Sequence, residues 1–166
     1  MIRCVINSMD FESVREMAFN TWPLAYGEII TKAQMDYMLE KMYSITSLQH
    51  QHDDLQHCFV IAIDETKKHL GFASFSSHST AVNHYRLHKL YVLPSLQKKG
   101  TGKILMDIIF NEIKKNGKGS IELNVNRNNN ALQFYLKLGF EITREEDIDI
   151  GNGFFMNDYV MERIVQ

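Results

Sequence analysis

The stretch that decides the fold is LYVLPSLQKKGTGKILMDIIFNEIKK, residues 90–115. An apolar strand end is stopped by Pro94, a loop with two glycines follows, and the rest has the apolar spacing of an amphipathic helix. The first turn of a helix carries unpaired N–H groups and the positive end of the helix dipole, so it attracts phosphate. Lys98, Lys99 and Lys103 add positive charge at the same place. The stretch therefore predicts a strand–loop–helix unit that binds a pyrophosphate.

Two well-known phosphate loops do not match this sequence. A Walker loop requires G-x-x-x-x-G-K-[ST], but Gly102 and Lys103 are followed by Ile104. A dinucleotide-binding loop requires G-x-G-x-x-G, and the place of its third glycine is taken by Leu105. The pattern that does fit is Q/R-x-x-G-x-G/A, beginning at Gln97. An ordinary strand-to-helix turn with a glycine start is the alternative for these six residues alone.

Composition indicates one globular domain, predicted to span residues 1–166. The chain is 45% hydrophobic and 23% charged, and its formal net charge of −2 argues against a nucleic-acid partner. Cys4 and Cys58 are too few for a disulfide framework and lack metal-ligand spacing, so no metal is expected. Apolar runs are too short for a membrane span, and the first residues do not resemble a signal peptide. These features predict a cytoplasmic protein without a membrane partner.

Working outward from residues 90–115, apolar periodicity and turn residues predict the remaining elements. Strands are expected at 2–7, 58–64, 70–78, 84–92, 120–125, 140–150 and 154–165. Helices are expected from a cap at Ser8 or Asp10 to about residue 20, from about 31 to 42, at 100–115 and at 129–138. Pro23 is expected to end the first helix and to leave an aromatic loop at 21–27. The strand–helix–strand order around 100–115 implies a parallel crossover. The fold class predicted is α/β, with a mixed central sheet of about six to seven strands and flanking helices.

Three histidines, His50, His52 and His57, lie in the polar segment 44–57, which we expect to be a short helix and a loop. Neither a cysteine nor a regular H-x₃₋₅-H spacing supports a metal site there. We predict that these histidines face solvent.

A second motif gives the chain a family resemblance. Residues 123–140 read LNVNRNNNALQFYLKLGF. Together with the loop that begins at Gln97, this segment is similar to the GNAT (GCN5-related) N-acetyltransferases of bacterial type, whose second motif reads N-x-x-A-x-x-x-Y-x-x-x-G-F. Its positions are filled by Asn128, Ala131, Tyr135, Gly139 and Phe140. The element order resembles the GNAT fold over essentially the whole chain, although one fold serves many substrates.

The resemblance implies that acetyl-CoA is the co-substrate, and it implies where it binds. The strand before the loop would hold the pantetheine arm through its backbone, at Leu90, Tyr91 and Val92. The loop and the helix start would hold the pyrophosphate, at Gln97, Lys98, Lys99, Gly100, Thr101, Gly102 and Lys103. Asn128, or its neighbour Asn130, would contact CoA or the place where the fourth and fifth strands part.

The resemblance also implies a direct attack of an amine on the thioester, with Tyr135 as the proton donor to the departing thiolate. A tyrosine has a pKa near 10 and can protonate a thiolate within hydrogen-bond reach. A core aromatic is the alternative for Tyr135. Two residues are candidates for the general base, His88 on the fourth strand and Glu28 after the first helix. A structural histidine and a surface glutamate remain the alternatives.

The acceptor predicted is a primary amine of a small molecule. Late acidic residues such as Glu145, Glu146 and Asp158 suit either a cationic acceptor or a solvated edge strand, and we favour the edge strand. A protein N-acetyltransferase and a non-catalytic acyl-CoA-binding regulator stay open as alternatives. A homodimer formed by pairing of the last strand is a further option.

Overall fold

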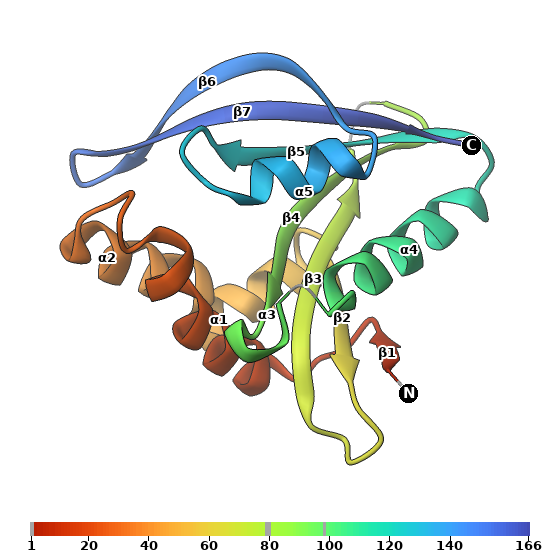
Figure 1. The fold of residues 1–166 in the computed structure, drawn as a ribbon, viewed down its shortest axis with the longest axis horizontal. Helices are drawn as coiled ribbons and strands as arrows, with labels where there is room; N and C mark the ends of the chain where they lie inside the picture. Colours follow the sequence, from red (N-terminus) through yellow and green to blue (C-terminus); the bar gives the residue numbers. More distant parts are fainter. Residues whose placement is uncertain (1, 79–80, 98) are drawn as a thin grey trace. The chain divides into compact units, whose positions relative to one another are not determined.

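The computed structural model describes residues 2–78, 81–97 and 99–166 (Figure 1). The elements in chain order are β1 Arg3–Ile6, α1 Phe11–Tyr26, α2 Lys32–Tyr43, α3 Ile45–Asp53, β2 Cys58–Ile63, β3 His69–Ser77, β4 His84–Val92, the short 3₁₀ helix η1 Pro94–Leu96, α4 Thr101–Lys114, β5 Gly119–Asn126, α5 Ala131–Lys137, β6 Glu141–Gly151 and β7 Phe154–Val165. The strands pair in the order β1-β2-β3-β4-β5-β7-β6. This seven-stranded mixed sheet with flanking helices confirms the predicted fold class.

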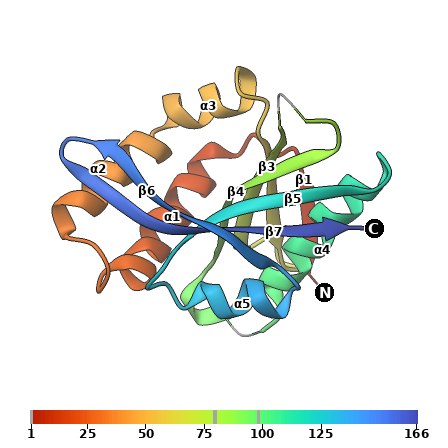
Figure 2. The ribbon, with the colours of Figure 1, turned by 90° about the horizontal axis from the view of Figure 1, so that it is seen from above.

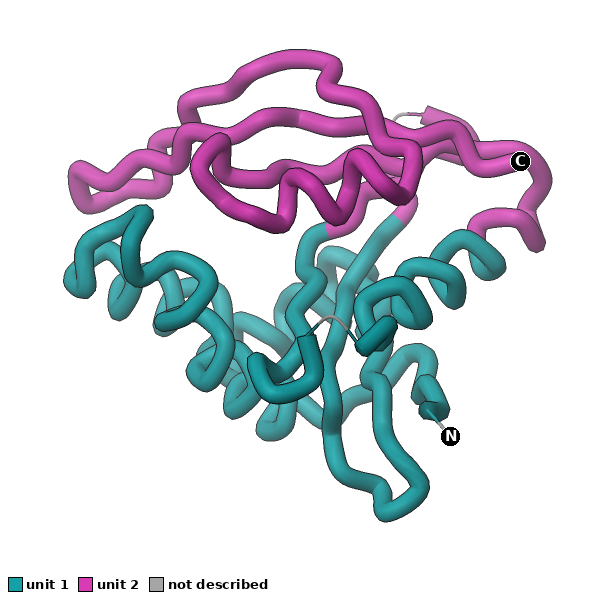
Figure 3. The backbone as a smooth tube through the Cα atoms, viewed as in Figure 1, with its two compact units in different colours: residues 1–76, 88–112 teal, residues 77–87, 113–166 magenta. Residues whose placement is uncertain are grey.

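The chain divides into two compact units (Figure 3). One consists of residues 1–76 and 88–112, and the other of residues 77–87 and 113–166. Strand β4 therefore contributes its beginning to the second unit and its end, from His88 onward, to the first. One domain over the whole chain stays a prediction.

The first unit holds the antiparallel strands β1, β2 and β3, the end of β4, and the helices α1, α2 and α3, which contact one another (Figure 2). Both predicted helix starts are confirmed, because Asp10 accepts a hydrogen bond from Ser13 N and Thr31 accepts one from Gln34 N. Its core combines aliphatic and aromatic side chains, and the largest fully buried ones include Trp22, Tyr43, Phe59 and Phe72.

The second unit is built on β5. The start of β4 pairs with it in parallel, His84–Leu87 against Ser120–Leu123, which confirms the predicted crossover. On its other edge β5 pairs with β7, and β7 pairs with β6 in a long twisted hairpin (Figure 2). The predicted hairpin turn is confirmed, since Gly151, Asn152 and Gly153 all have positive φ. The homodimer option required the last strand, β7, to pair with a second copy of the chain. Both edges of β7 are already paired within the chain, one with β5 and the other with β6.

The prediction that Pro23 ends the first helix is wrong. Helix α1 continues to Tyr26, and the segment 21–27 is helical up to that residue. A proline inside a helix removes one N–H donor and crowds the preceding turn. Here the burial of Trp22, which is 1% exposed and stacks 4.6 Å from the Tyr26 ring, offsets that cost. The helix is then closed by Gly27, whose N–H donates to Pro23 O at 3.0 Å.

The prediction of three solvent-facing histidines is wrong for one of them. His50 and His52 lie in α3 and pair with neighbouring aspartates. His57, directly before β2, is only 8% exposed, and its ring stacks on His88 with 3.7 Å between the centroids. A contact with a residue so distant in sequence leaves no local pattern in the segment 44–57, so periodicity could not reveal it.

A lysine lies inside the first unit. Lys89 on β4 is 5% exposed, and its ammonium donates to Gln51 Oε1 and lies 5.4 Å from the centre of the Tyr43 ring. Within the described residues no carboxylate forms an ion pair with it. Burial lowers the pKa of Lys89 to about 7. Folding therefore places a group that is charged in the unfolded chain where charge is costly.

We predict that Lys89 makes the protein less stable as the pH falls from 10.5, its ordinary pKa, to about 7. Within this window the unfolded chain binds a proton that the folded chain does not, so stability rises with pH. The full effect is roughly 5 kcal/mol, and roughly half of it falls between pH 7 and pH 9. Urea unfolding at these two pH values measures it, and Lys89→Met should remove the difference.

The control for this measurement is Lys32→Met. Lys32 is exposed and pairs with Asp36 on the surface of α2, so this variant should keep the pH dependence of the wild type. An equal gain in stability between pH 7 and pH 9 in Lys89→Met and in the wild type would contradict the assignment.

Candidate active site

The end of β4 is held tightly against β3. Leu93 N donates to Leu70 O at 3.0 Å, directly after the strand. A Cβ atom at Gly71 would meet Tyr91 O at 2.6 Å, so only glycine permits this approach. The ladder that joins β4 to β5 ends at Leu87, whereas β4 itself continues to Val92. The peptide groups of residues 88–92 on that edge lie outside this ladder.

The glycine loop connects β4 to α4 by a compact turn. Gln97 N donates to Pro94 O, and its side-chain amide reaches back to Val92 O at 3.4 Å. Gly100 has φ +88° with open space around it, a conformation that residues with a side chain rarely adopt. Helix α4 then begins at Thr101, which is 2% exposed. The loop thus brings the N-terminus of a long helix to the end of β4.

The lysines near this helix start differ in their surroundings. Lys103 lies on α4 and its ammonium is 2.6 Å from the carboxylate of Asp107, one turn further on. Lys99 is exposed, and Lys98 lies outside the described residues. Gly102 is half-buried on the first turn of α4. The N–H groups of the first turn of a helix have no acceptor within the helix, so they can bind an anion even without contacts from the lysine side chains.

An aromatic cluster anchors the end of β4 from the side of α1 and α2. The Tyr91 ring lies 5.6 Å from Phe72 and 6.1 Å from Trp22, and its hydroxyl is 3.2 Å from that of Tyr26. Burial raises the pKa of Tyr91 well above its ordinary value, and the nearby Tyr26 and Tyr43 raise it further. Tyr91 is therefore a neutral structural anchor, and what it offers a ligand is its backbone.

His88 lies two residues before Leu90, where the proposed pantetheine segment begins, and it contacts Ser76 and His57. Its Nε2 is hydrogen-bonded to Ser76 Oγ at 2.8 Å, and its ring lies parallel to that of His57. Burial, followed by the nearby Lys89, lowers the pKa of His57 to about 4, so His57 is neutral near neutral pH. His88 is half-exposed. Ser76 and His57 are contacts that no sequence pattern indicated.

Glu28, the other candidate base, is placed differently. It lies in the exposed turn after α1, next to Ile29 and Ile30, whose N–H groups donate to Tyr26 O. No hydrogen bond or ion pair joins its carboxylate to another residue in the described part of the chain. His88 and Glu28 are both in the first unit, but no contact brings them together.

The remaining predicted site residues belong to the second unit. Asn128 and Asn130 are exposed in the turn between β5 and α5, whereas the side chains that shape this turn are those of Asn126 and Asn129. Tyr135 on α5 is 7% exposed, and its ring packs edge-on against Phe134 and Phe140. Gly139, with φ +82°, ends α5 as predicted. The CoA loop, His88 and Glu28 lie in the first unit.

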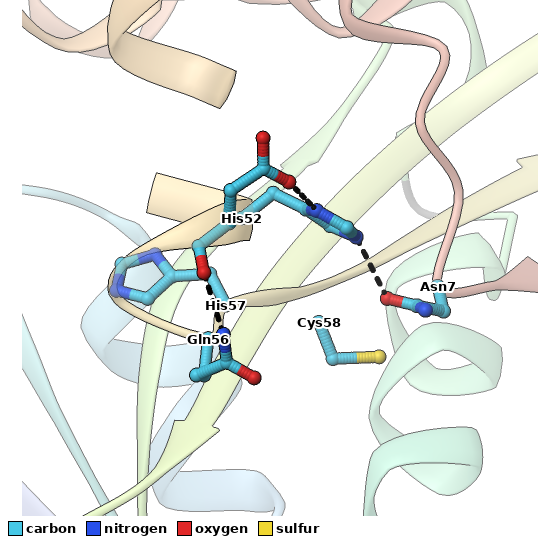
Figure 4. Close-up of a pocket in the computed structure, with 6 residues that line it drawn as sticks. Asn7, His52, Gln56, His57 and Cys58 are labelled. Atoms are coloured by element: carbon cyan, nitrogen blue, oxygen red, sulfur yellow. Dashed lines mark hydrogen bonds and ion pairs between the residues drawn. The ribbon is translucent and has the colours of Figure 1, made fainter. Parts of the chain in front are cut away.

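A small polar pocket lies in the first unit (Figure 4). It has a volume of about 270 Å³ and is lined by Asn7, His52, Asp53, Gln56, His57 and Cys58. Its lining is held by hydrogen bonds from the His52 ring to Asp53 and to Asn7 (Figure 4). None of the predicted CoA-binding residues lines it, so it is not the candidate active site.

Residues 2–78, 81–97 and 99–166 contain neither a cluster of metal ligands nor a helix suited to span a membrane. No group of three or more histidine, cysteine, aspartate or glutamate side chains there is arranged to hold a metal ion. None of the helices described is both long and apolar enough to cross a membrane.

Most of the chain is similar to a known protein family. The model of an acetyltransferase (GNAT) domain matches residues 29–162. A curated mycothiol acetyltransferase from Renibacterium salmoninarum is 35% identical over 86 residues, which are 49% of this chain. The aligned part is 25% of that relative, so the chain spans about a quarter of its length.

Solved structures extend the likeness to nearly the whole chain. The PaiA N-acetyltransferase from Thermoplasma acidophilum, solved in complex with coenzyme A, is 25% identical over 98% of both chains, with a TM-score of 0.79. A GCN5-related N-acetyltransferase from Rhodopseudomonas palustris shares the fold, with a TM-score of 0.77 at 16% identity over 98% of this chain and 94% of that one. With a family model that covers residues 29–162, the chain belongs to the GNAT family of acetyltransferases, as the two sequence motifs predicted.

Proposed function

We propose that this protein is an acetyl-CoA-dependent N-acetyltransferase that acetylates a primary amine of a small molecule. The observation that carries the proposal is the unit formed by the end of β4, Gly100 and the start of α4. In this unit, the edge of β4 that lies outside the β4–β5 ladder is followed by the N-terminus of α4. Acetyl-CoA has an arm that ends in a thioester, which such a strand edge can bind, and a pyrophosphate, which a helix N-terminus can bind. The family membership supports the same activity.

In this proposal the co-substrate lies along the first unit. The peptide groups of Leu90, Tyr91 and Val92 hydrogen-bond to the pantetheine arm, which carries amide groups. The pyrophosphate binds the N–H groups of the residues from Gly100 to Lys103, where the helix dipole favours negative charge. The solved relative with coenzyme A lends support to acetyl-CoA as the ligand. Asn128, Asn130 and the lysines Lys98 and Lys99 complete the proposed contacts.

The reaction proposed is a direct transfer. The nitrogen of the neutral amine attacks the carbonyl carbon of the thioester, a C–N bond forms and the C–S bond breaks. The amine gives up one proton to a base, and the thiolate of CoA accepts one proton, so the products are an amide and a free thiol. N–H groups of the β4 edge stabilise the charge that develops on the carbonyl oxygen. Holding both reactants in place supplies much of the rate increase.

We assign the base role to His88 rather than to Glu28. Its imidazole is oriented by Ser76 and by the parallel ring of His57, and it lies two residues before Leu90, where the segment proposed to bind the thioester begins. A histidine accepts a proton near neutral pH without a large shift of its pKa. Glu28 lacks such orienting contacts among the described residues. Tyr135 is proposed as the donor to the thiolate, because its hydroxyl is the acid that the second motif provides.

A small-molecule acceptor is supported by the curated relative, whose name is mycothiol acetyltransferase. Thiol release from acetyl-CoA against a panel of amines, amino sugars, amino acids and a lysine peptide tests the activity and the class of acceptor together. Turnover with the peptide alone would favour a protein acceptor. Binding of acetyl-CoA without turnover on any amine would favour a regulator.

Gly100→Ala should weaken acetyl-CoA binding while leaving the fold intact. The left-handed φ of +88° costs a residue with a Cβ about 1–2 kcal/mol, and the loop can escape this strain by turning its N–H groups away. We expect the KM for acetyl-CoA to rise about tenfold, in line with an energy of that size. Gly117→Ala is the matched control, because Gly117 has φ +95° and open space but lies after α4. Equal KM values in both variants would contradict the role of the loop.

His88→Gln should lower kcat by about 10²-fold or more, since general-base catalysis contributes factors of this size. It should also remove the inflection on the rising limb of the pH profile of kcat, because glutamine does not titrate. Glu28→Gln should keep both the rate and the inflection of the wild type. The reverse pattern in the two variants would transfer the base role to Glu28.

Tyr135→Phe should lower kcat while the KM for acetyl-CoA stays close to that of the wild type. Phenylalanine keeps the edge-on packing against Phe134 and Phe140, so only the hydroxyl is lost. Tyr85→Phe serves as control, because it removes a hydroxyl that accepts a hydrogen bond from Asn116 within the second unit. An unchanged kcat in Tyr135→Phe would exclude Tyr135 as the proton donor.

A further inference from the structure

The hydroxyl of Ser76 on β3 lies 2.8 Å from Nε2 of His88 on the neighbouring strand β4. Both side chains are half-exposed, and both residues belong to the first unit. Within the described part of the chain, Ser76 Oγ makes no other hydrogen bond. The direction of this one hydrogen bond decides which nitrogen of His88 can act as a base.

The two possible directions have different chemical consequences. A serine hydroxyl can donate or accept, and a neutral imidazole carries one proton, either on Nδ1 or on Nε2. If Ser76 donated to Nε2, the proton of His88 would be on Nδ1, and the lone pair of the ring would be held by the hydroxyl. His88 could then take up a proton only by breaking this bond. If Ser76 accepts from Nε2–H instead, the lone pair is on Nδ1.

The second direction also suits the charged form of His88. After His88 has taken up a proton, both of its nitrogens carry hydrogen and can only donate. A bond from Nε2–H to Ser76 Oγ is present before and after this step, so the ring does not have to turn during the reaction. Such a bond becomes stronger when its donor becomes charged, and it therefore favours the imidazolium.

The ring of His57 restrains His88 in a different way. The two ring planes differ by 10°, and their centroids lie 3.7 Å apart. Nδ1 of His57 is buried and has no hydrogen-bond partner among the described residues, so a bond at this nitrogen does not account for the position of the ring. The stack holds the plane of the His88 ring, and the bond to Ser76 fixes the rotation of the ring within that plane.

The charges next to this stack come from β4 and α3. Burial lowers the pKa of His57 to about 4, with further contributions from Lys89 on β4 and His50 on α3. His57 is therefore neutral near neutral pH, and the face of a neutral aromatic ring attracts a cation. A second charged imidazole at this distance would repel the imidazolium of His88. His57 thus offers a neutral surface against which His88 can become charged.

We infer that Ser76 is a positioning residue, which accepts a hydrogen bond from Nε2–H of His88 and so makes Nδ1 the atom that takes the proton of the attacking amine. The amine nitrogen forms its bond to the carbonyl carbon and gives one proton to Nδ1, while Nε2 keeps the proton that it shares with Ser76. The inference uses residues of the first unit alone. It rests on the proposed N-acetyltransferase function.

NMR of the histidine side chains tests the direction of the bond, with the His88 signals assigned by their loss in His88→Gln. In the wild type, the nitrogen-15 shifts of neutral His88 should show a proton on Nε2 and none on Nδ1. Ser76→Ala should lower the pKa of His88, because the imidazolium loses its acceptor. A hydroxyl that donated would stabilise the neutral ring instead. A raised or unchanged pKa in Ser76→Ala, or a proton on Nδ1 in the wild type, would overturn the inference.

Kinetics test what this orientation does for the reaction. Ser76→Ala should lower kcat about three- to tenfold, as expected for the loss of one hydrogen bond, and should leave the KM for acetyl-CoA unchanged. The inflection of the pH profile of kcat should move to lower pH together with the pKa of His88. Ser76→Thr keeps the hydroxyl and should restore both properties. Ser77→Ala is the matched control, because Ser77 is the exposed next residue of the same strand.

The NMR measurement does not depend on turnover, so it separates this inference from the function on which it rests. A lowered pKa of His88 in Ser76→Ala, with no acetylation of any amine by the wild type, would support the direction of the bond and reject the function. Acetylation by Ser76→Ala with the kcat and the inflection of the wild type would overturn the inference and keep the function.

Discussion

The contact between β3 and the end of β4 is the constraint on which the first unit depends. At Gly71 the two strands approach so closely that a single methyl group would meet the carbonyl oxygen of Tyr91. On the same stretch, the Tyr91 side chain is fixed by rings from α1, α2 and β3. The position of the strand edge therefore does not rely on a ligand. A site for an acyl chain needs such rigidity, because misplacement of the carbonyl by even a small distance is costly for the reaction.

Much of this arrangement could be predicted from the sequence, because it is determined by residues that are close together in the chain. The glycine loop, the amphipathic helix after it and the turn at Gly151–Gly153 follow from periodicity and from the special backbone freedom of glycine. The prediction that Pro23 ends the first helix is wrong, because the burial of Trp22 outweighs the local tendency of a proline to break a helix. The stack of His57 on His88 could not be predicted, since it joins residues far apart in sequence that share no pattern.

The two units each contain a buried charged residue, and the two residues differ in sign and in their surroundings. The first unit buries one lysine, Lys89, with a neutral amide as its partner, and burial lowers its pKa toward neutrality. In the second unit, arginines form ion pairs with Glu122 and Asp147, whereas Asp158 has no ion-pair partner among the described residues and its Oδ1 accepts no hydrogen bond. Both residues are costly to bury. A cost of this kind is common at functional positions, where a group is kept ready for a proton or a ligand rather than for stability.

The strand order of the second unit also has a consequence for synthesis on the ribosome. Strand β5 pairs with β7, the last strand of the chain, and not with β6, which is made before it. The edge of β5 from Gly119 to Asn126 that faces β7 therefore has no partner until β7 has been translated. An open strand edge is a site of wrong association. Removal of residues 159–165 of β7 would thus leave an inner strand, β5, with an open edge from Gly119 to Val125.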